Sequence, residues 1–184
     1  VEDSGVSDKH TIISPVPGST FVLETVDGCL VPPSTATFSW EVNPALGEPM
    51  YWWFYLGNSP HSQNLHNSGR LTADRRSWTV TGPLPTDGRP VFATLWWQDG
   101  DQLPWQSAFF VYNTPAMPEI ISPTPGASLP GSFGDFDVNR HGLAVEFWQI
   151  LAGTLGEPAL YYDSSVLFDP DPGGGAVRIS YAGI

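Results

Sequence analysis

The stretch MYWWFYLGN, residues 50–58, is an apolar run that ends at a Gly-Asn pair, and it predicts a β-strand followed by a turn. Successive side chains of a strand point to opposite faces, so the run divides into two sets. The set that suits a buried core consists of Met50, Trp52, Phe54 and Leu56. The opposite set is entirely aromatic and consists of Tyr51, Trp53 and Tyr55.

A second run, RPVFATLWWQDGD at residues 89–101, alternates in the same way and closes on an Asp-Gly turn. Over residues 90–97 the expected core set is Val91, Ala93, Leu95 and Trp97, and the opposite set is Phe92, Thr94 and Trp96. If the two strands are neighbours, an outward aromatic patch forms from Tyr51, Trp53, Tyr55, Phe92 and Trp96. Such a patch can stack on sugar rings or bury against another subunit. A loop or a neighbouring domain can also cover it.

Three further strand-length runs surround these two: STATFSWEV (34–42), RRSWTVTG (75–82) and LPWQSAFFVYNT (103–114). All are rich in β-branched and aromatic residues and are separated by turn signals at regular spacing, which predicts an all-β sandwich or barrel. The 19 Gly and 19 Pro residues are too many for a helical protein, and 13% aromatic residues argue against disorder.

Two phrases of the sequence occur twice. IISPVPGST (12–20) returns as IISPTPGAS (120–128), and ALGEPMYWW (45–53) returns as TLGEPALYY (154–162). Both matches have nearly the same spacing, which indicates an internal duplication. The spacing of the second match aligns Phe38 with Phe147 and Val42 with Leu151.

This duplication predicts tandem Ig-like β-sandwiches, of which the second is truncated or is completed by a partner. By the alignment, the second copy has no counterpart of the last three strands of the first, and a half sandwich would expose its apolar face. A neighbouring chain is the expected cover, and the possible donor arm carries Val1 and Val6. The predicted parts are an N-terminal arm (1–11), a first sandwich (12–114), a Pro-rich linker (115–119) and a second, incomplete sandwich (120–184).

The first copy resembles the Ig-like, fibronectin-III-like modules of secreted and surface bacterial proteins. The resemblance is carried by a Pro-Gly-Ser entry, the Thr-Phe-Ser-Trp strand, the Tyr-Trp-rich strand ending in Gly, the Asn-Ser-Gly turn and the Leu-Pro-Thr-Asp-Gly turn. It covers residues 12–114 well and 119–166 weakly. The resemblance implies an extracellular or cell-surface location, and such modules serve as spacers, adhesive units, glycan-binding units or fibre subunits.

The charge and the missing motifs exclude several function classes. A formal charge of −12, from 19 acidic and seven basic residues, should repel nucleic acid and anionic membranes. No run approaches 18 apolar residues, so no membrane insertion is expected. The sequence has no nucleophile elbow, phosphate loop or zinc-protease motif, so neither an enzyme nor a cofactor is predicted. The lone Cys29 is interpreted as a buried small side chain, with an intermolecular disulfide as the alternative.

Metal binding has two weak candidates. His61 and His66 share one loop but lack further ligands, so they are interpreted as polar loop residues. Asp169 and Asp171 precede glycines at a spacing that can hold calcium, but prolines interrupt the pattern and no closing Glu follows. A stiff connector is the preferred interpretation of that segment.

Two functions fit these observations. The first is a non-enzymatic, extracellular structural or adhesive protein that self-assembles into a filament or surface layer, with copies of itself as partners. The alternative is a glycan-binding accessory module of a secreted enzyme, which predicts exposed Trp53 and Trp96 on a polysaccharide-binding face.

Overall fold

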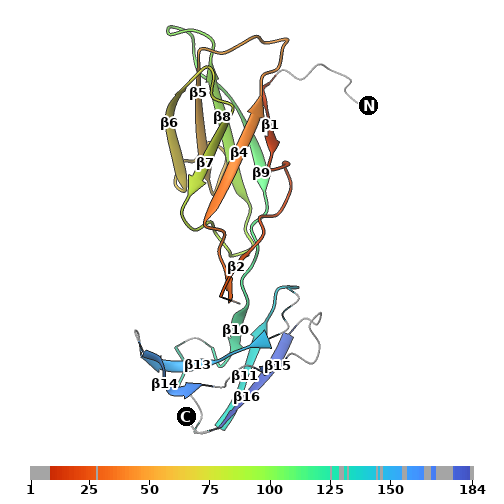
Figure 1. Cartoon of the computed structure of the whole chain (residues 1–184), viewed down its shortest axis with the longest axis vertical. Helices are drawn as coiled ribbons and strands as arrows, with labels where there is room; N and C mark the ends of the chain where they lie inside the picture. The colour runs from red at the N-terminus through yellow and green to blue at the C-terminus, as the bar shows by residue number, and fades with distance from the viewer. Residues whose placement is uncertain are drawn as a thin grey trace. The chain divides into compact units, whose positions relative to one another are not determined.

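The computed structural model of the chain is built from β-strands, and no helix occurs in the part that it describes (Figure 1). It describes residues 9–27, 29–124, 126–128, 131, 133–143, 145, 147–154, 157–163, 167–168 and 176–182. The chain divides into two compact units, Val1–Pro115 and Ala116–Ile184. Over the described residues, no helix is long and apolar enough to cross a membrane. The predicted donor-arm residues Val1 and Val6 and the calcium candidates Asp169 and Asp171 lie outside the described residues.

The first unit is a sandwich of two antiparallel sheets. One sheet has the order β1-β4-β7 and the other the order β6-β5-β8-β9. Their strands are β1 (Thr11–Ser14), β4 (Thr35–Glu41), β5 (Tyr51–Gly57), β6 (His66–Thr72), β7 (Ser77–Thr81), β8 (Val91–Gln98) and β9 (Gln106–Tyr112). A separate hairpin consists of β2 (Glu24–Val26) and β3 (Cys29–Val31). The prediction of an all-β fold is confirmed.

Alternation along the strands places the core between the sheets. Phe38 and Trp40 of β4 are buried while Thr37 is exposed and hydrogen-bonded to Thr79 across to β7, at 2.9 Å. From the facing sheet, Trp52, Phe54, Leu56, Ala93 and Leu95 are fully buried. The predicted core set is correct except for Met50, which precedes β5 and is 42% exposed. Met50 still donates its N–H to the Gln98 carbonyl at 2.8 Å, so backbone pairing extends one residue beyond the buried face.

The repeated IISP phrase has the same local structure in both units. In the first, the pairing of β1 with β4 shifts between Ile12 and Ser14, and the Ser14–Pro15 peptide is cis. The chain then leaves β4 and pairs with the other sheet, where Thr20 bridges Asn113 in parallel. In the second unit, the pairing shifts between Ile120 and Ser122, and the Ser122–Pro123 peptide is again cis.

The second unit contains one three-stranded sheet of order β10-β11-β16 and two short hairpins, β12-β15 and β13-β14. Their strands are β10 (Glu119–Ser122), β11 (Phe133–Asn139), β12 (Phe147–Trp148), β13 (Leu151–Thr154), β14 (Glu157–Asp163), β15 (Leu167–Phe168) and β16 (Ala176–Ala182). A small cluster of buried residues, Phe136, Val138, Ile150 and Ile179, lies against Trp148, Leu167 and Val177.

The strand pairing corrects the alignment of the two copies. Strand β10 pairs with β11, so the counterpart of Phe38 lies in β11 and not at Phe147. The second Leu-Gly-Glu-Pro phrase reaches into the start of β14, which pairs with β13, whereas the first lies between β4 and β5, which belong to different sheets. Strand β16 pairs with β11 as β7 pairs with β4, so the expectation that the strand around Trp78 has no counterpart is wrong.

Cys29 also differs from its prediction. It lies in the β2-β3 hairpin and is exposed, because this hairpin packs neither face into the core. The prediction that Cys29 is a buried small side chain is therefore wrong.

Candidate functional site

The outer face of the four-stranded sheet carries a continuous set of aromatic rings. Strands β5 and β8 pair with Trp53 directly opposite Trp96, which brings all five predicted patch residues together. Two further rings join them: Phe109 from β9, and Trp105 from the turn before β9. Neither ring was assigned to a face from the sequence pattern. We call this surface the aromatic face: Tyr51, Trp53, Tyr55, Phe92, Trp96, Trp105 and Phe109.

The rings of the aromatic face contact one another edge to face. The centroid of Trp53 lies 5.7 Å from that of Tyr55 and 5.7 Å from that of Trp105, and Tyr55 lies 6.0 Å from Trp96. These separations are in the range in which aromatic pairs attract. Trp53 therefore contacts two other rings of the face, and Tyr55 links it to Trp96.

A β-bulge brings polar side chains to the edge of the aromatic face. The pairing of β5 with β6 sets Trp53 opposite Arg70 and Tyr55 opposite Asn67, with a shift between them. Arg70 and Asn67 are three residues apart, and residues at that spacing share a strand face only when an extra residue is inserted. Gly69 has a φ of 69°, a left-handed conformation that glycine adopts readily and that such a bulge requires. Asn67 accepts the Trp53 indole N–H at 2.6 Å and the Gly69 N–H at 2.8 Å through one oxygen.

The loop of residues 58–64 folds back over one end of the aromatic face. The His61 N–H donates to the Thr94 hydroxyl at 3.1 Å, and the His61 ring lies 5.4 Å from Trp96 and 5.7 Å from Phe109. Thr94 is therefore fully buried, although alternation predicts it to point outward. The Trp96 indole N–H is buried without a hydrogen-bond partner under this loop.

Gly57 is required for this fold-back. A Cβ at position 57 would lie 2.4 Å from the Ser62 carbonyl oxygen, so a larger residue would displace the loop. The aromatic face thus has a covered end at Trp96 and Phe109. Its open end consists of Tyr51, Trp53, Tyr55 and Trp105, which are half-buried and carry no such loop.

The two histidines predicted to share one loop lie on different elements, because His61 is in the β5-β6 connection and His66 begins β6. His61 contacts the aromatic face, whereas His66 accepts the Trp78 indole N–H at 2.7 Å through Nε2, and burial lowers the pKa of His66. No group of three potential metal ligands occurs among the residues described.

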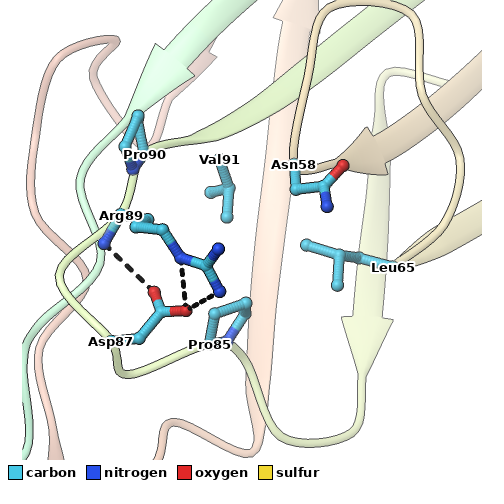
Figure 2. A pocket seen from close by; sticks show the side chains of 7 residues that line it. All are labelled: Asn58, Leu65, Pro85, Asp87, Arg89, Pro90 and Val91. Atoms are coloured by element: carbon cyan, nitrogen blue, oxygen red, sulfur yellow. Dashed lines mark hydrogen bonds and ion pairs between the residues drawn. The ribbon is translucent and has the colours of Figure 1, made fainter.

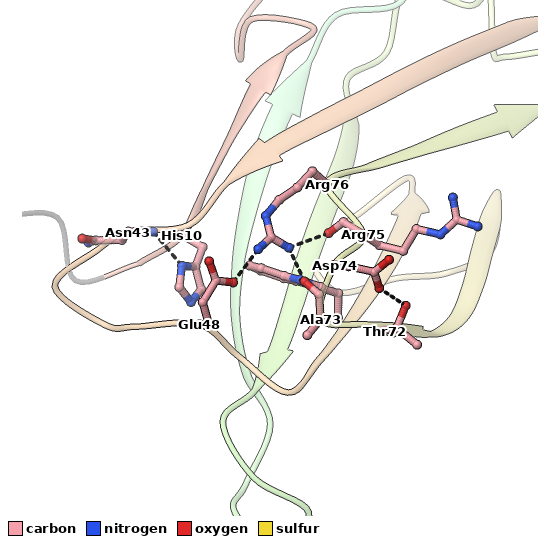
Figure 3. Close-up of polar contacts among 9 residues, drawn as sticks. His10, Asn43, Glu48, Thr72, Ala73, Asp74, Arg75 and Arg76 are labelled. Carbon is pink, nitrogen blue, oxygen red and sulfur yellow. Dashed lines mark hydrogen bonds and ion pairs between the residues drawn. The ribbon is translucent and has the colours of Figure 1, made fainter.

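A polar cluster lies around the buried His10 and extends to the partly exposed Arg76 and the exposed Glu48 (Figure 3). His10 is fully buried between Trp52 and Trp97, with ring centroids 4.9 and 4.8 Å away, and its Nδ1 accepts the Asn43 N–H at 2.9 Å. Burial lowers the pKa of His10. Arg76 lies over the Trp52 ring and bonds Glu48 and the Ala73 carbonyl. The charged groups of this cluster, Arg76 and Glu48, are paired with each other.

A small cavity lies between the β5-β6 and β7-β8 connections (Figure 2). It measures about 230 Å³ and is lined by Asn58, Leu65, Pro85, Asp87, Arg89, Pro90 and Val91. Arg89 Nε donates to Asp87 at 2.8 Å, and this contact lowers the pKa of the Asp87 carboxyl. The lining holds one carboxylate already paired with arginine and no nucleophile, so it does not form a catalytic set.

Comparison with known proteins does not show a family for this chain. No family model and no curated protein matches the chain. Among solved structures, an alpha-L-rhamnosidase from Dictyoglumus thermophilum is similar at 13% identity and TM-score 0.41, over 76% of this chain and 18% of that one. The chicken CNTN1 FN1-FN3 domains are similar at 10% identity and TM-score 0.30, over 82% of this chain and 51% of theirs.

The chain therefore spans about a fifth of the rhamnosidase and about half of the CNTN1 fragment. The two sheets of the first unit, β1-β4-β7 and β6-β5-β8-β9, form an Ig- or fibronectin-III-like β-sandwich.

Proposed function

We propose that the chain is a non-enzymatic adhesive module of an extracellular protein, and that it binds its target through the aromatic face. The observation that carries this proposal is the contrast between the two outer faces of the first sandwich. The three-stranded sheet presents hydroxyl residues to solvent, including the opposed pairs Thr35–Thr81 and Thr37–Thr79. The four-stranded sheet presents half-buried aromatic rings and the exposed Phe109 instead, so an aromatic outer surface is specific to this sheet.

A carbohydrate is the ligand that the open end of the aromatic face fits best. The apolar face of a sugar ring stacks on aromatic side chains, and the hydroxyls at its edge need hydrogen-bonding partners. Asn67 supplies an amide group that bonds the Trp53 indole, and the Asn67 amide is itself bonded to the Gln63 side chain. Aromatic rings and amide groups together can bind a sugar without catalysing a reaction on it.

Replacement of Trp53 by Ala is expected to lower polysaccharide affinity about thirtyfold, because truncation of a central aromatic anchor costs about 2 kcal/mol or more. Affinity electrophoresis against a panel of neutral and acidic polysaccharides measures the effect. Thr37→Ala, on the outer face of the other sheet, is the control and should bind as the wild type does. Retention of binding by Trp53→Ala, or failure of the wild type to bind any polymer, would contradict a carbohydrate-binding role for the aromatic face.

A specific observation in the second unit favours self-association as a second function. Ile120 pairs with Val138 as Ile12 pairs with Trp40, yet Ile120 is 40% exposed and Ile12 only 2%. Ile121 and Phe147 are also exposed, at 48% and 50%. Apolar area removed from water stabilises an association by about 25 cal/mol per Å². A second copy of the chain that covers Ile120 would complete the burial that Ile12 has within the first unit.

Replacement of Ile120 by Asp is expected to shift the chain from an oligomer to a monomer, because it places a charge in the proposed contact. Size-exclusion chromatography with light scattering measures the molar mass. Ile13→Asp is the control, since Ile13 is similarly exposed, at 43%, but lies in the first unit. A wild-type chain that stays monomeric at every concentration reached would rule out self-association through this surface.

A further inference from the structure

Arg70 lies over the Tyr51 ring at the edge of the aromatic face. Its guanidinium carbon lies 4.4 Å from the centre of the Tyr51 ring, and its strand position is directly opposite Trp53. The N–H donors of a guanidinium lie in one plane and match the two oxygens of a carboxylate or sulfate group, and contact with a ring restricts the positions of the side chain. Arg70 is exposed, so its free edge is accessible from solvent.

The charge of Arg70 is not neutralised within the described part of the chain. Three other arginines there form ion pairs: Arg76 with Glu48, Arg89 with Asp87, and Arg178 with Asp137. Arg70 forms none, although the chain has 19 acidic residues against seven basic ones. Because Arg70 contacts a ring and has no carboxylate partner among the described residues, its guanidinium can bind an anionic group of a ligand.

We infer that the ligand of the aromatic face is an acidic polysaccharide, with a sugar ring on Trp53 and its carboxylate or sulfate group on Arg70. This inference rests on the proposed carbohydrate-binding function of the same face. Opposed residues of an antiparallel pair have Cβ atoms about 5 Å apart, which a sugar ring and its acidic substituent can span. The bulge at Gly69 is what places Arg70 and Asn67 together beside the rings.

The net charge of −12 opposes the approach of a polyanion but does not prevent this contact. At an ionic strength of about 0.15 M, interactions between exposed charges are screened beyond about 8 Å. The direct contact between Arg70 and an acidic group is shorter than that distance. Binding assays at this ionic strength therefore report the local recognition and suppress the long-range repulsion.

Affinity electrophoresis with matched polymers tests the inference. The acidic panel is polygalacturonate, alginate, hyaluronate and heparin, and the matched controls are the methyl-esterified or carboxyl-reduced forms of the first three. The wild type is expected to bind at least one acidic polymer about tenfold more tightly than a neutral form, since one charge-assisted contact is worth about that factor. Binding to heparin alone identifies sulfate, and binding to a uronate polymer identifies carboxylate, as the group at Arg70.

Variants separate this inference from the function on which it rests. Arg70→Gln should lose about tenfold affinity for the acidic polymer and keep the wild-type affinity for its neutral form. Trp53→Ala should lose affinity for both. Equal binding of the acidic and neutral forms, or an Arg70→Gln variant that binds like the wild type, would overturn the inference while leaving the carbohydrate function intact. Failure of every polymer to bind would overturn both.

Discussion

Replacement of Phe38 by Ala is expected to lower the free energy of unfolding of the first unit by about 3–5 kcal/mol. Phe38 is fully buried and lies in the centre of the core, with ring centroids 4.7 Å from Phe54, 5.4 Å from Tyr112 and 6.1 Å from Phe21. It belongs to one sheet while Phe54 and Tyr112 belong to the other, so its removal opens a cavity where the two sheets meet.

Denaturant unfolding monitored by tryptophan fluorescence measures this loss, because Trp148 is the sole tryptophan outside the first unit. Phe109→Ala is the matched control: the same truncation is made on the outer face, where Phe109 is 43% exposed. It should cost about 1 kcal/mol or less, as is usual where no buried cavity forms. Equal losses for the two variants would show that the core does not lie where the strand pairing places it.

Acidification from pH 7 toward pH 5 is expected to destabilise the first unit through His10. Burial lowers the pKa of His10 below its ordinary value of 6.5, despite the nearby Asp99 and Glu48 carboxylates, and the Arg76 guanidinium lowers it further. A group with a lowered folded-state pKa contributes its full stability above its unfolded pKa and loses it as the pH falls below that value. Protonation at Nδ1 would also remove the acceptor of the Asn43 N–H.

The slope of unfolding free energy against pH, from urea titrations at several pH values, measures this effect. His10→Gln should flatten the slope below pH 6.5 and also lower stability at pH 7, because a fully buried ring between two tryptophans is lost. His66→Gln should flatten it further, since burial lowers the pKa of His66 in the same direction. If the His10→Gln variant kept the wild-type slope, His10 would not be the cause of the loss of stability at low pH.

The period of two predicts which side chains of β5 and β8 face the core, because it depends only on the local backbone. Trp52, Phe54 and Leu56 are fully buried as expected, and Trp53 and Trp96 lie on the other face. The same reasoning fails at positions that depend on distant contacts. Thr94 is buried because a loop from another part of the chain covers it, and no pattern within its own strand indicates that loop.

The second unit shows a different limit of sequence reasoning. A short phrase such as Leu-Gly-Glu-Pro favours a change of chain direction but does not determine which strands flank it. In the first unit it lies between strands of different sheets, and in the second it lies beside two strands that pair with each other. Aligning the copies on this phrase therefore misplaced the strand opposite β10. Arg70 was missed for a related reason. Gly69 was the available signal, because a glycine inside a strand often marks a bulge that changes which residues share a face.

The fold-back of residues 58–64 makes His61 a tethered competitor of any ligand that reaches Trp96. Such a ligand binds only molecules whose loop has opened, so its apparent dissociation constant equals the intrinsic value divided by the open fraction. A ligand confined to Trp53, Tyr55 and Trp105 meets no such competition. Short saccharides are thus expected to occupy the open end alone, whereas longer ones gain contacts only by displacing the histidine.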